Sequence, residues 1–189
     1  MACPLRLSPV TPRDTRAARL EALYERHYGA VWAYARRRVR SAADADDVVA
    51  QTWLAVWRRL DDVPDGDELP WCFGVARRCV ANHRRSEDRR LRLARCLPVE
   101  RSVDAVRALD DDGADVHRAL ARLSSDDREL LMLVGWEGLS ISEIGVVVGA
   151  SPANVSVRLH RARKKFAKHL QDLRDDGHMS VTAPITEGS

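Results

Sequence analysis

Residues 138–170 read G-L-S-I-S-E-I-G-V-V-V-G-A-S-P-A-N-V-S-V-R-L-H-R-A-R-K-K-F-A-K-H-L, and this stretch predicts two helices joined by a tight turn. Ser140 and Glu143 form a capping box, which satisfies free N–H groups at a helix start. Gly149 ends the first helix, because glycine tolerates the left-handed backbone that a helix C-terminus often needs. Ser151, followed by proline, predicts the start of the second helix.

Both predicted helices have an apolar side. The apolar residues of the first helix are Ile141, Ile144 and Val148. Those of the second helix recur at helical spacing and form one packing stripe: Val155, Leu159, Ala162, Phe166 and Leu170. Another side of the second helix carries Arg158, Arg161 and Lys165, and no Asp or Glu occurs between Ser151 and Gln171.

A short capped helix, a glycine turn and a longer basic helix are typical of a helix-turn-helix, which places its second helix in the major groove of DNA. A basic face also occurs on amphipathic helices that only meet solvent. The capped helix and the turn before the basic helix favour the interpretation that this segment binds DNA.

The bulk composition is that of a soluble globular protein, with 45% apolar and 31% charged residues in 189. The net charge is only +3, although the charges are segregated, which predicts local basic surfaces. The four cysteines, Cys3, Cys72, Cys79 and Cys96, form no C-x-x-C pair. Because the chain also lacks a signal peptide and a long apolar run, we expect a reduced, cytoplasmic protein without membrane insertion.

The order of these features predicts an all-α fold with two small helical domains joined by a flexible acidic linker, the second domain ending in the helix-turn-helix. Apolar periodicity and turn signals set the boundaries. The predicted segments are a disordered arm at 1–18, a first domain at 19–96, the linker at 97–114, a second domain at 115–173 and a disordered tail at 174–189.

The first predicted domain ends in aromatic residues followed by a basic patch. After an acidic loop at 61–70, a helix is expected to begin near Pro70 and to carry Trp71 and Phe73 into an arginine-rich segment. Cations can hold phosphates while flat rings stack on unpaired bases, so this order suits nucleic acid. For Phe73 alone, burial in the core is the better interpretation, since helical aromatic residues are usually buried.

Three segments in this order resemble the extracytoplasmic-function sigma factors of bacterial RNA polymerase, and the resemblance covers roughly Leu20 to Leu170. D-A-D-D-V-V-A-Q-T-W-L-A-V-W at 44–57 is similar to the family's polymerase-binding helix. P-W-C-F-G-V-A-R-R-C-V-A-N-H-R-R at 70–85 is similar to its promoter-melting and minus-ten segment. The helix-turn-helix is similar to the family's minus-thirty-five reader.

The resemblance implies a protein that binds core RNA polymerase, directs it to promoter DNA and helps to melt the promoter. It is also compatible with an anti-sigma factor as a partner. Implied contacts with the minus-thirty-five element are Ser151, Pro152, Ala153, Asn154, Ser156, Val157, Arg158, Arg161, Lys164 and Lys165. Implied contacts with the minus-ten element are Trp71, Arg77, Arg78, Asn82, His83 and Arg85. Implied contacts with core polymerase are Asp44, Asp46, Asp47, Val48, Gln51, Trp53 and Trp57.

Some positions depart from the family pattern. Arg78 and Asn82 stand where the family often has Asn and Asp, so its promoter preference does not transfer. Gly145 replaces the usual Ala and is expected to weaken its helix by ~1 kcal/mol.

Three other interpretations fit parts of the sequence. A two-domain helix-turn-helix regulator would share the second domain, but it would not need the arginine-rich stretch after Trp71. An enzyme is disfavoured, because the chain has no phosphate-binding glycine loop and no nucleophile motif; no catalytic residue and no cofactor are predicted. Cys79 and His83, with Cys72 nearby, have the spacing to share a zinc ion, but we expect these cysteines to be core residues instead.

Overall fold

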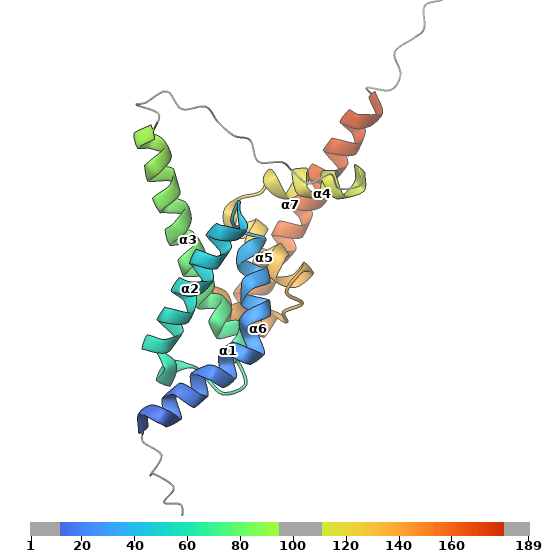
Figure 1. The fold of residues 1–189 in the computed structure, drawn as a ribbon. Helices are drawn as coiled ribbons and strands as arrows, with labels where there is room; N and C mark the ends of the chain where they lie inside the picture. Colours follow the sequence, from blue (N-terminus) through green and yellow to red (C-terminus); the bar gives the residue numbers. More distant parts are fainter. Residues whose placement is uncertain (1–11, 95–110, 180–189) are drawn as a thin grey trace, which may run out of the picture. The chain divides into compact units, whose positions relative to one another are not determined.

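The computed structural model describes residues 12–94 and 111–179. These ranges contain seven α-helices, one short 3-10 helix and no strand (Figure 1). The chain divides into two compact units, Met1–Val99 and Glu100–Ser189. The predicted all-α fold class is thereby confirmed. None of the helices within the described ranges combines the length and the apolar content that a membrane span requires.

The first unit is a three-helix bundle of α1 (Pro12–Arg36), α2 (Ala42–Arg58) and α3 (Glu68–Ala94). Each helix packs against the other two, and a 3-10 helix at Leu60–Asp62 lies between α2 and α3. In the core the rings of Tyr34 and Phe73 stack with centroids 5.0 Å apart. Phe73 is therefore a core residue, as expected from its place on an amphipathic helix.

The first helix begins earlier than predicted. Residues 12–18 belong to α1 rather than to a loose arm, and residues 1–11 lie outside the described ranges. This turn lacks apolar periodicity but is held by arginines: Arg16 donates to the Trp57 carbonyl at 3.0 Å and pairs with Asp61. Arg19 donates to the Val63 carbonyl, also at 3.0 Å. Polar contacts between distant segments thus extend a helix that the apolar pattern does not reveal.

The second unit consists of α4 (Asp111–Ala121), α5 (Ser125–Gly135), α6 (Ile141–Val148) and α7 (Pro152–Met179). The long helix α7 packs against each of the other three. Arg128 ties α5 to the end of α4, since its guanidinium donates to the carbonyls of Leu120 at 2.8 Å and Ala121 at 3.0 Å.

Two predicted boundaries of this unit are corrected by the structure. Helix α4 already begins at Asp111, inside the segment predicted as linker, and α7 continues past residue 173 to Met179. The remainder of the predicted linker, 97–110, and of the predicted tail, 180–189, lies outside the described ranges, as do residues 95–96 of the predicted first domain.

The predicted turn between α6 and α7 is confirmed. Ser140 and Glu143 form both halves of the capping box, and Gly149 adopts the left-handed conformation with φ 69°. Ser151 accepts a hydrogen bond from the Asn154 N–H at 3.4 Å and so caps α7. The buried side of α6 differs slightly from the prediction, because Ile144 and Val147 are buried whereas Ile141 is 41% exposed.

Gly145 has a role that the sequence analysis missed. A Cβ at this position would lie 2.7 Å from the carbonyl oxygen of Ala150. The N–H of Ala150 in turn donates to the Gly145 carbonyl at 3.0 Å. Glycine therefore permits the close approach of the turn to α6, and its effect is not only the weak helix propensity expected.

Candidate nucleic-acid interface

Most side chains at the beginning of α7 are exposed, next to a buried stripe. Val155, Leu159 and Ala162 are buried against the rest of the unit, as their spacing predicted. The exposed positions are Ser151, Pro152, Ala153, Asn154, Ser156 and Val157. Val157 is a large apolar residue with 52% of its surface exposed. Such a surface can enter a groove of DNA without any rearrangement of the core.

The cations of α7 fall into two groups. Arg161, Lys164 and Lys168 are exposed and lie opposite the buried stripe; we call them the outer cations. Arg158 and Lys165 lie at the edge of that surface, next to the start of α5. Lys165 Nζ donates to Asp127 Oδ2 at 2.7 Å, and the Arg158 guanidinium is 3.9 Å from an oxygen of Asp126.

The pKa of Asp127 is lowered from the usual value for an aspartate. The hydrogen bond from Lys165 is the main cause of its lowered pKa, with further help from Ser124 and from the charge of Arg158. Ser124 Oγ also accepts a hydrogen bond from the Asp127 N–H at 3.2 Å, which caps α5. Carboxylates in the first turn of a helix are favoured by its dipole, so this acidic turn is stable beside the basic helix.

A second basic surface follows one side of α3. Its members are spaced at helical intervals on the side opposite the buried Ala76 and Cys79, and we call them the α3 stripe: Arg78, Asn82, Arg85, Arg89 and Arg92. All five are exposed, and Arg85 donates to the Asn82 side-chain oxygen. The first three were predicted site residues. Arg89 and Arg92 were predicted only as part of a basic patch, although they continue the helical spacing of the first three residues.

The other predicted minus-ten residues are less open. Trp71 is half-buried, with the Arg59 guanidinium 5.4 Å from the centre of its ring. Arg77 is also half-buried. His83 Nε2 lies 3.3 Å from Asp44 Oδ1, and its side chain is 16% exposed.

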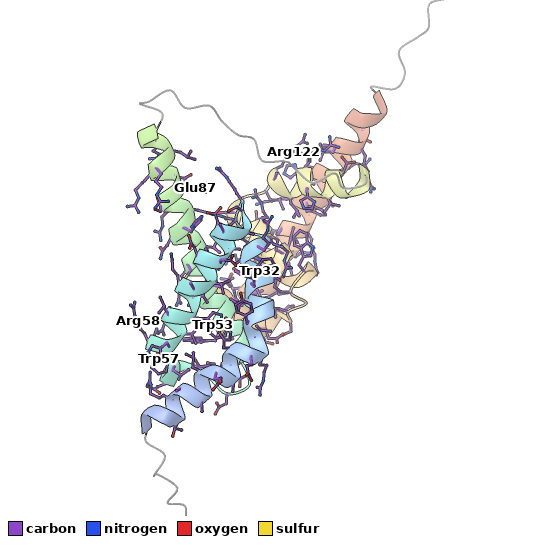
Figure 2. The ribbon with its side chains drawn as sticks, in the orientation of Figure 1. Trp32, Trp53, Trp57, Arg58, Glu87 and Arg122 are labelled. Atoms are coloured by element: carbon purple, nitrogen blue, oxygen red, sulfur yellow. The ribbon has the colours of Figure 1, made fainter. Side chains whose placement is uncertain are left out.

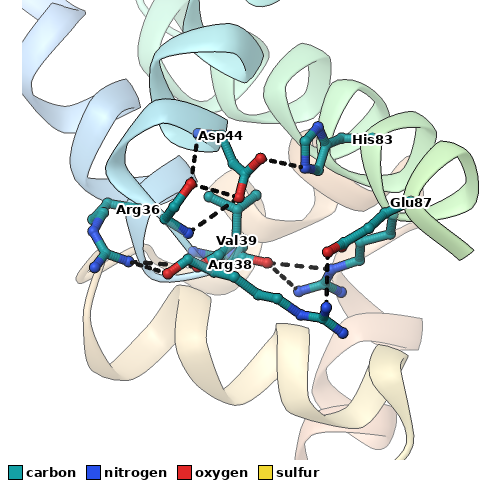
Figure 3. Close-up of polar contacts among 9 residues, drawn as sticks. Arg36, Arg38, Val39, Asp44, His83 and Glu87 are labelled. Carbon is teal, nitrogen blue, oxygen red and sulfur yellow. Dashed lines mark hydrogen bonds and ion pairs between the residues drawn. The ribbon is translucent and has the colours of Figure 1, made fainter. Parts of the chain in front are cut away.

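Figure 3 shows how contacts around His83 join α3 to the corner between α1 and α2. Arg84 donates to the Arg38 carbonyl at 2.7 Å and 3.2 Å through two nitrogens. Arg40 and Glu87 form an ion pair at 2.9 Å. These contacts fix the direction of the basic half of α3, so the α3 stripe is held on a rigid support.

Cys79 and His83 have different surroundings in the structure. Cys79 is 8% exposed, whereas His83 faces Asp44. In the part of the chain that the structure describes, no group of three His, Cys, Asp or Glu residues is arranged to hold a metal ion.

The predicted polymerase-binding residues of α2 separate into exposed and structural positions. Asp47 and Gln51 are exposed, and Asp46 accepts a hydrogen bond from Trp32 Nε1 at 2.8 Å. Asp44 instead closes the capping box of α2 with Ser41. Trp57 is half-buried, with the Arg16 guanidinium 5.2 Å from its ring.

Two predicted contacts on α2 need correction. Val48 is fully buried, and Trp53, which Figure 2 labels, is 7% exposed, so both side chains belong to the core. Both follow the apolar stripe of α2, which packs on α1 and α3. Their neighbours on the open surface are large apolar residues that the prediction omitted, Tyr24, Tyr28 and Leu54, with 43%, 36% and 56% exposed. Leu54 lies outside the apolar stripe of α2, and this position in the sequence could have identified it as a surface residue.

An apolar hollow on the second unit was also missed. It has a volume of about 390 Å³ and lies among α4, α5 and α7. Its lining includes Val116, Leu120, Leu131, Val134, Trp136 and Phe166. Trp136 is 43% exposed. Apolar periodicity does not reveal such a hollow, because it does not show where a core is left uncovered.

Comparisons with known proteins agree with both units. Residues 23–90 match the family described as Sigma-70 region 2, and residues 114–166 match Sigma-70, region 4. The ECF RNA polymerase sigma factor SigL of Mycobacterium tuberculosis is 32% identical over 163 residues, which cover 83% of this chain and 92% of SigL. The ECF RNA polymerase sigma factor SigF of Caulobacter vibrioides is 35% identical over 153 residues, covering 77% and 80% of the two chains.

A solved structure has the same fold. CnrH, determined in complex with the cytosolic domain of CnrY, superposes with a TM-score of 0.59 at 28% identity. The match covers 85% of this chain and 97% of CnrH. It therefore extends over both units rather than over the widespread helix-turn-helix alone.

Proposed function

This chain belongs to the extracytoplasmic-function sigma factors and directs RNA polymerase to promoters, and on that premise we propose which of its surfaces meet DNA and polymerase. The observation that carries the proposal is the exposed beginning of α7 with its outer cations, on a helix anchored by a buried stripe. The protein acts through binding, in the cytoplasm, without a chemical step of its own.

The second unit reads the upstream promoter element. The start of α7 enters the major groove, where Asn154, Ser156 and Arg161 are exposed and within reach of base edges. Arginine forms two parallel hydrogen bonds with guanine, worth ~1–3 kcal/mol of discrimination. Lys164 and Lys168 meet phosphates, which contributes affinity without sequence preference. Arg158 and Lys165 belong to the same surface, where the carboxylates of α5 compete with DNA phosphates for them.

The first unit holds the separated strand of the downstream element. The α3 stripe offers a row of cations to the phosphates, and Asn82 adds an amide that can recognise a base. Unstacking costs a few kcal/mol per base, and capture of the released bases offsets that cost. Trp71 supports this surface, although its ring is already half-covered by Arg59.

The surface for core polymerase lies on the open side of α1 and α2. Exposed Asp47 and Gln51 supply its polar part, and the exposed aromatic residues Tyr24 and Tyr28 supply apolar area. A binding surface that combines a polar rim with aromatic anchors is typical of specific protein interfaces.

We further propose an anti-sigma protein as a partner. CnrH, which is similar to this chain along most of its length, was solved with the cytosolic domain of another protein. The hollow containing Trp136 has the apolar lining that a helix of a partner protein would fill.

The test is run-off transcription with purified core polymerase on promoters randomised in the upstream element. Arg161→Ala should relax the preference at particular positions, because it removes a base contact. Lys168→Ala should weaken all promoters alike and reduce the salt dependence, because it removes a phosphate contact.

Two results would contradict the proposal. If Arg161→Ala lowers every promoter by the same factor, its contribution is electrostatic only and α7 does not read bases through it. If the wild type binds DNA but starts no transcription with core enzyme, the alternative of a helix-turn-helix regulator outside the polymerase is favoured.

A further inference from the structure

Two carboxylates of α5 lie against two of the cations that α7 would offer to DNA. Asp127 accepts a hydrogen bond from Lys165 Nζ at 2.7 Å, and Asp126 lies 3.9 Å from the Arg158 guanidinium. The Asp127 side chain is only 14% exposed, whereas that of Lys165 is 58% exposed. The cation is therefore open to solvent on one side and held by a fixed anion on the other.

The outer cations differ in this respect. Arg161 and Lys164 are exposed, and no ion pair to either is recorded within the described ranges. These two residues, together with Arg158 and Lys165, lie within two turns of one helix and meet the same solvent. The acidic turn of α5 therefore divides the basic surface of α7 into a paired part and an open part.

A phosphate that approaches Lys165 must compete with Asp127 for the same ammonium group. If the ion pair persists, the phosphate gains little from a neutralised cation and meets a nearby negative charge; if it breaks, the energy of the pair is lost. The N-terminal position of Asp127 in α5 keeps its charge favourable, since the helix dipole stabilises an anion there. Either outcome lowers the affinity for DNA of any sequence.

We propose that Asp126 and Asp127 form an intramolecular clamp that withholds Arg158 and Lys165 from phosphates, so that DNA binding depends more strongly on the exposed base-reading positions. This inference rests on the proposed function of α7 as the DNA-binding helix. In this proposal Asp126 and Asp127 reduce non-specific binding to DNA and thereby sharpen promoter choice, although neither residue contacts DNA.

The experiment measures binding of the full chain to a short fluorescein-labelled duplex of random sequence by anisotropy, across a range of salt. Asp127→Asn keeps the shape of the side chain and removes its charge. We expect about two- to five-fold tighter binding, the worth of an exposed ion pair. The slope of log K against log salt should become steeper by about 0.9, as one more phosphate contact forms. Asp172→Asn, the same charge change on α7 away from this turn, is the matched control.

A double-mutant cycle tests the pairing itself. Lys165→Ala should have little effect on DNA binding in the wild type, where Lys165 is withheld. In the Asp127→Asn background the same change should remove the gain in affinity. Thermal unfolding followed by circular dichroism shows whether the variants fold; if Asp127→Asn does not, Asp126→Asn provides a second test through Arg158.

The outcomes separate this inference from the function on which it rests. If Lys164→Ala weakens binding but Asp127→Asn has no more effect than Asp172→Asn, α7 binds DNA and the clamp is wrong. Weaker binding by Asp127→Asn, or equal effects of Lys165→Ala in both backgrounds, would also overturn the clamp. If neither Lys164→Ala nor Lys168→Ala changes the affinity, the proposed DNA surface fails and the clamp fails with it.

Discussion

At the scale of single residues, Cys72 and Cys79 show how burial governs chemistry. Both thiols lie in the core of the first unit. Burial is the main cause that raises the pKa of Cys72 to about 12, and it also raises the pKa of Cys79. The reactive form of cysteine is the thiolate, so both residues are expected to be inert in the folded protein.

We predict that these two thiols react with a disulfide reagent only when the first unit unfolds. With a pKa of about 12, about one Cys72 thiol in ten thousand is ionised at pH 8. The measurement uses a chain with Cys3→Ser and Cys96→Ser, so that Cys72 and Cys79 are its remaining cysteines. Both thiols should become reactive together when denaturant unfolds the first unit. Rapid reaction of either thiol in buffer would contradict the prediction.

Residue-level prediction from sequence succeeded where the cause was local and failed where it was not. Ser140 and Gly149 act within their own turn, and both were identified correctly. Gly145 was judged by helix propensity alone, whereas its reason is the carbonyl of Ala150 in the following turn. The pairing of Lys165 with Asp127 joins residues 38 positions apart, and no periodicity within one helix can reveal it.

At the scale of elements, the start of α2 combines a cap with a contact to another helix. Asp44 accepts hydrogen bonds from the Ser41 N–H at 3.2 Å and the Ser41 hydroxyl at 2.7 Å. The Ser41 side chain is the main cause of the lowered pKa of Asp44, and His83 contributes through its charge. Asp44, predicted as a polymerase contact, thus caps the start of α2 and also contacts His83 of α3.

We predict that Asp44→Ala lowers the free energy of unfolding by about 1 kcal/mol at pH 7, the usual worth of a helix cap. The folded-state pKa is depressed, so this stability is present above the unfolded pKa of about 3.9 and is lost as pH falls through the folded value. Urea unfolding at pH 7 and near pH 3 should show a difference that shrinks on acidification.

Asp47→Ala is the matched control for this experiment, because Asp47 is an exposed acid on the same helix. It should change the stability little at either pH. A difference between wild type and Asp44→Ala that stays constant down to pH 2 would show that the carboxylate charge does not carry the effect.

The ends of elements mark the limit of the apolar pattern. It identified the helices that build each core, because burial repeats at helical spacing. It missed the start of α1 and the last turns of α7, where the sequence contains few apolar residues. In α1 the missing signal was an interaction of Arg16 and Arg19 with segments more than 40 positions away.

At the scale of the whole molecule, each unit contains what a domain needs for stability. The core of the first unit includes Val31, Tyr34 and Phe73, and that of the second includes Leu130, Ile144 and Val155, all at most 2% exposed. The division falls at residues 99 and 100, within the segment predicted to be a linker. Two small cores of this kind are marginal but sufficient when polar contacts close the helix ends.

We therefore predict that fragments 12–94 and 111–179 each fold alone. Circular dichroism should show helical spectra and a cooperative thermal transition for both, because each fragment retains its complete set of packed helices. A first fragment shortened to begin at residue 20 should be less stable, since it loses Arg16, Arg19 and their contacts with the segment after α2. The second fragment should bind duplex DNA by itself, more weakly than the full chain, because the effective concentration supplied by the first unit is lost. If either fragment is unfolded while the intact chain is folded, the units depend on each other and the division into two domains is wrong.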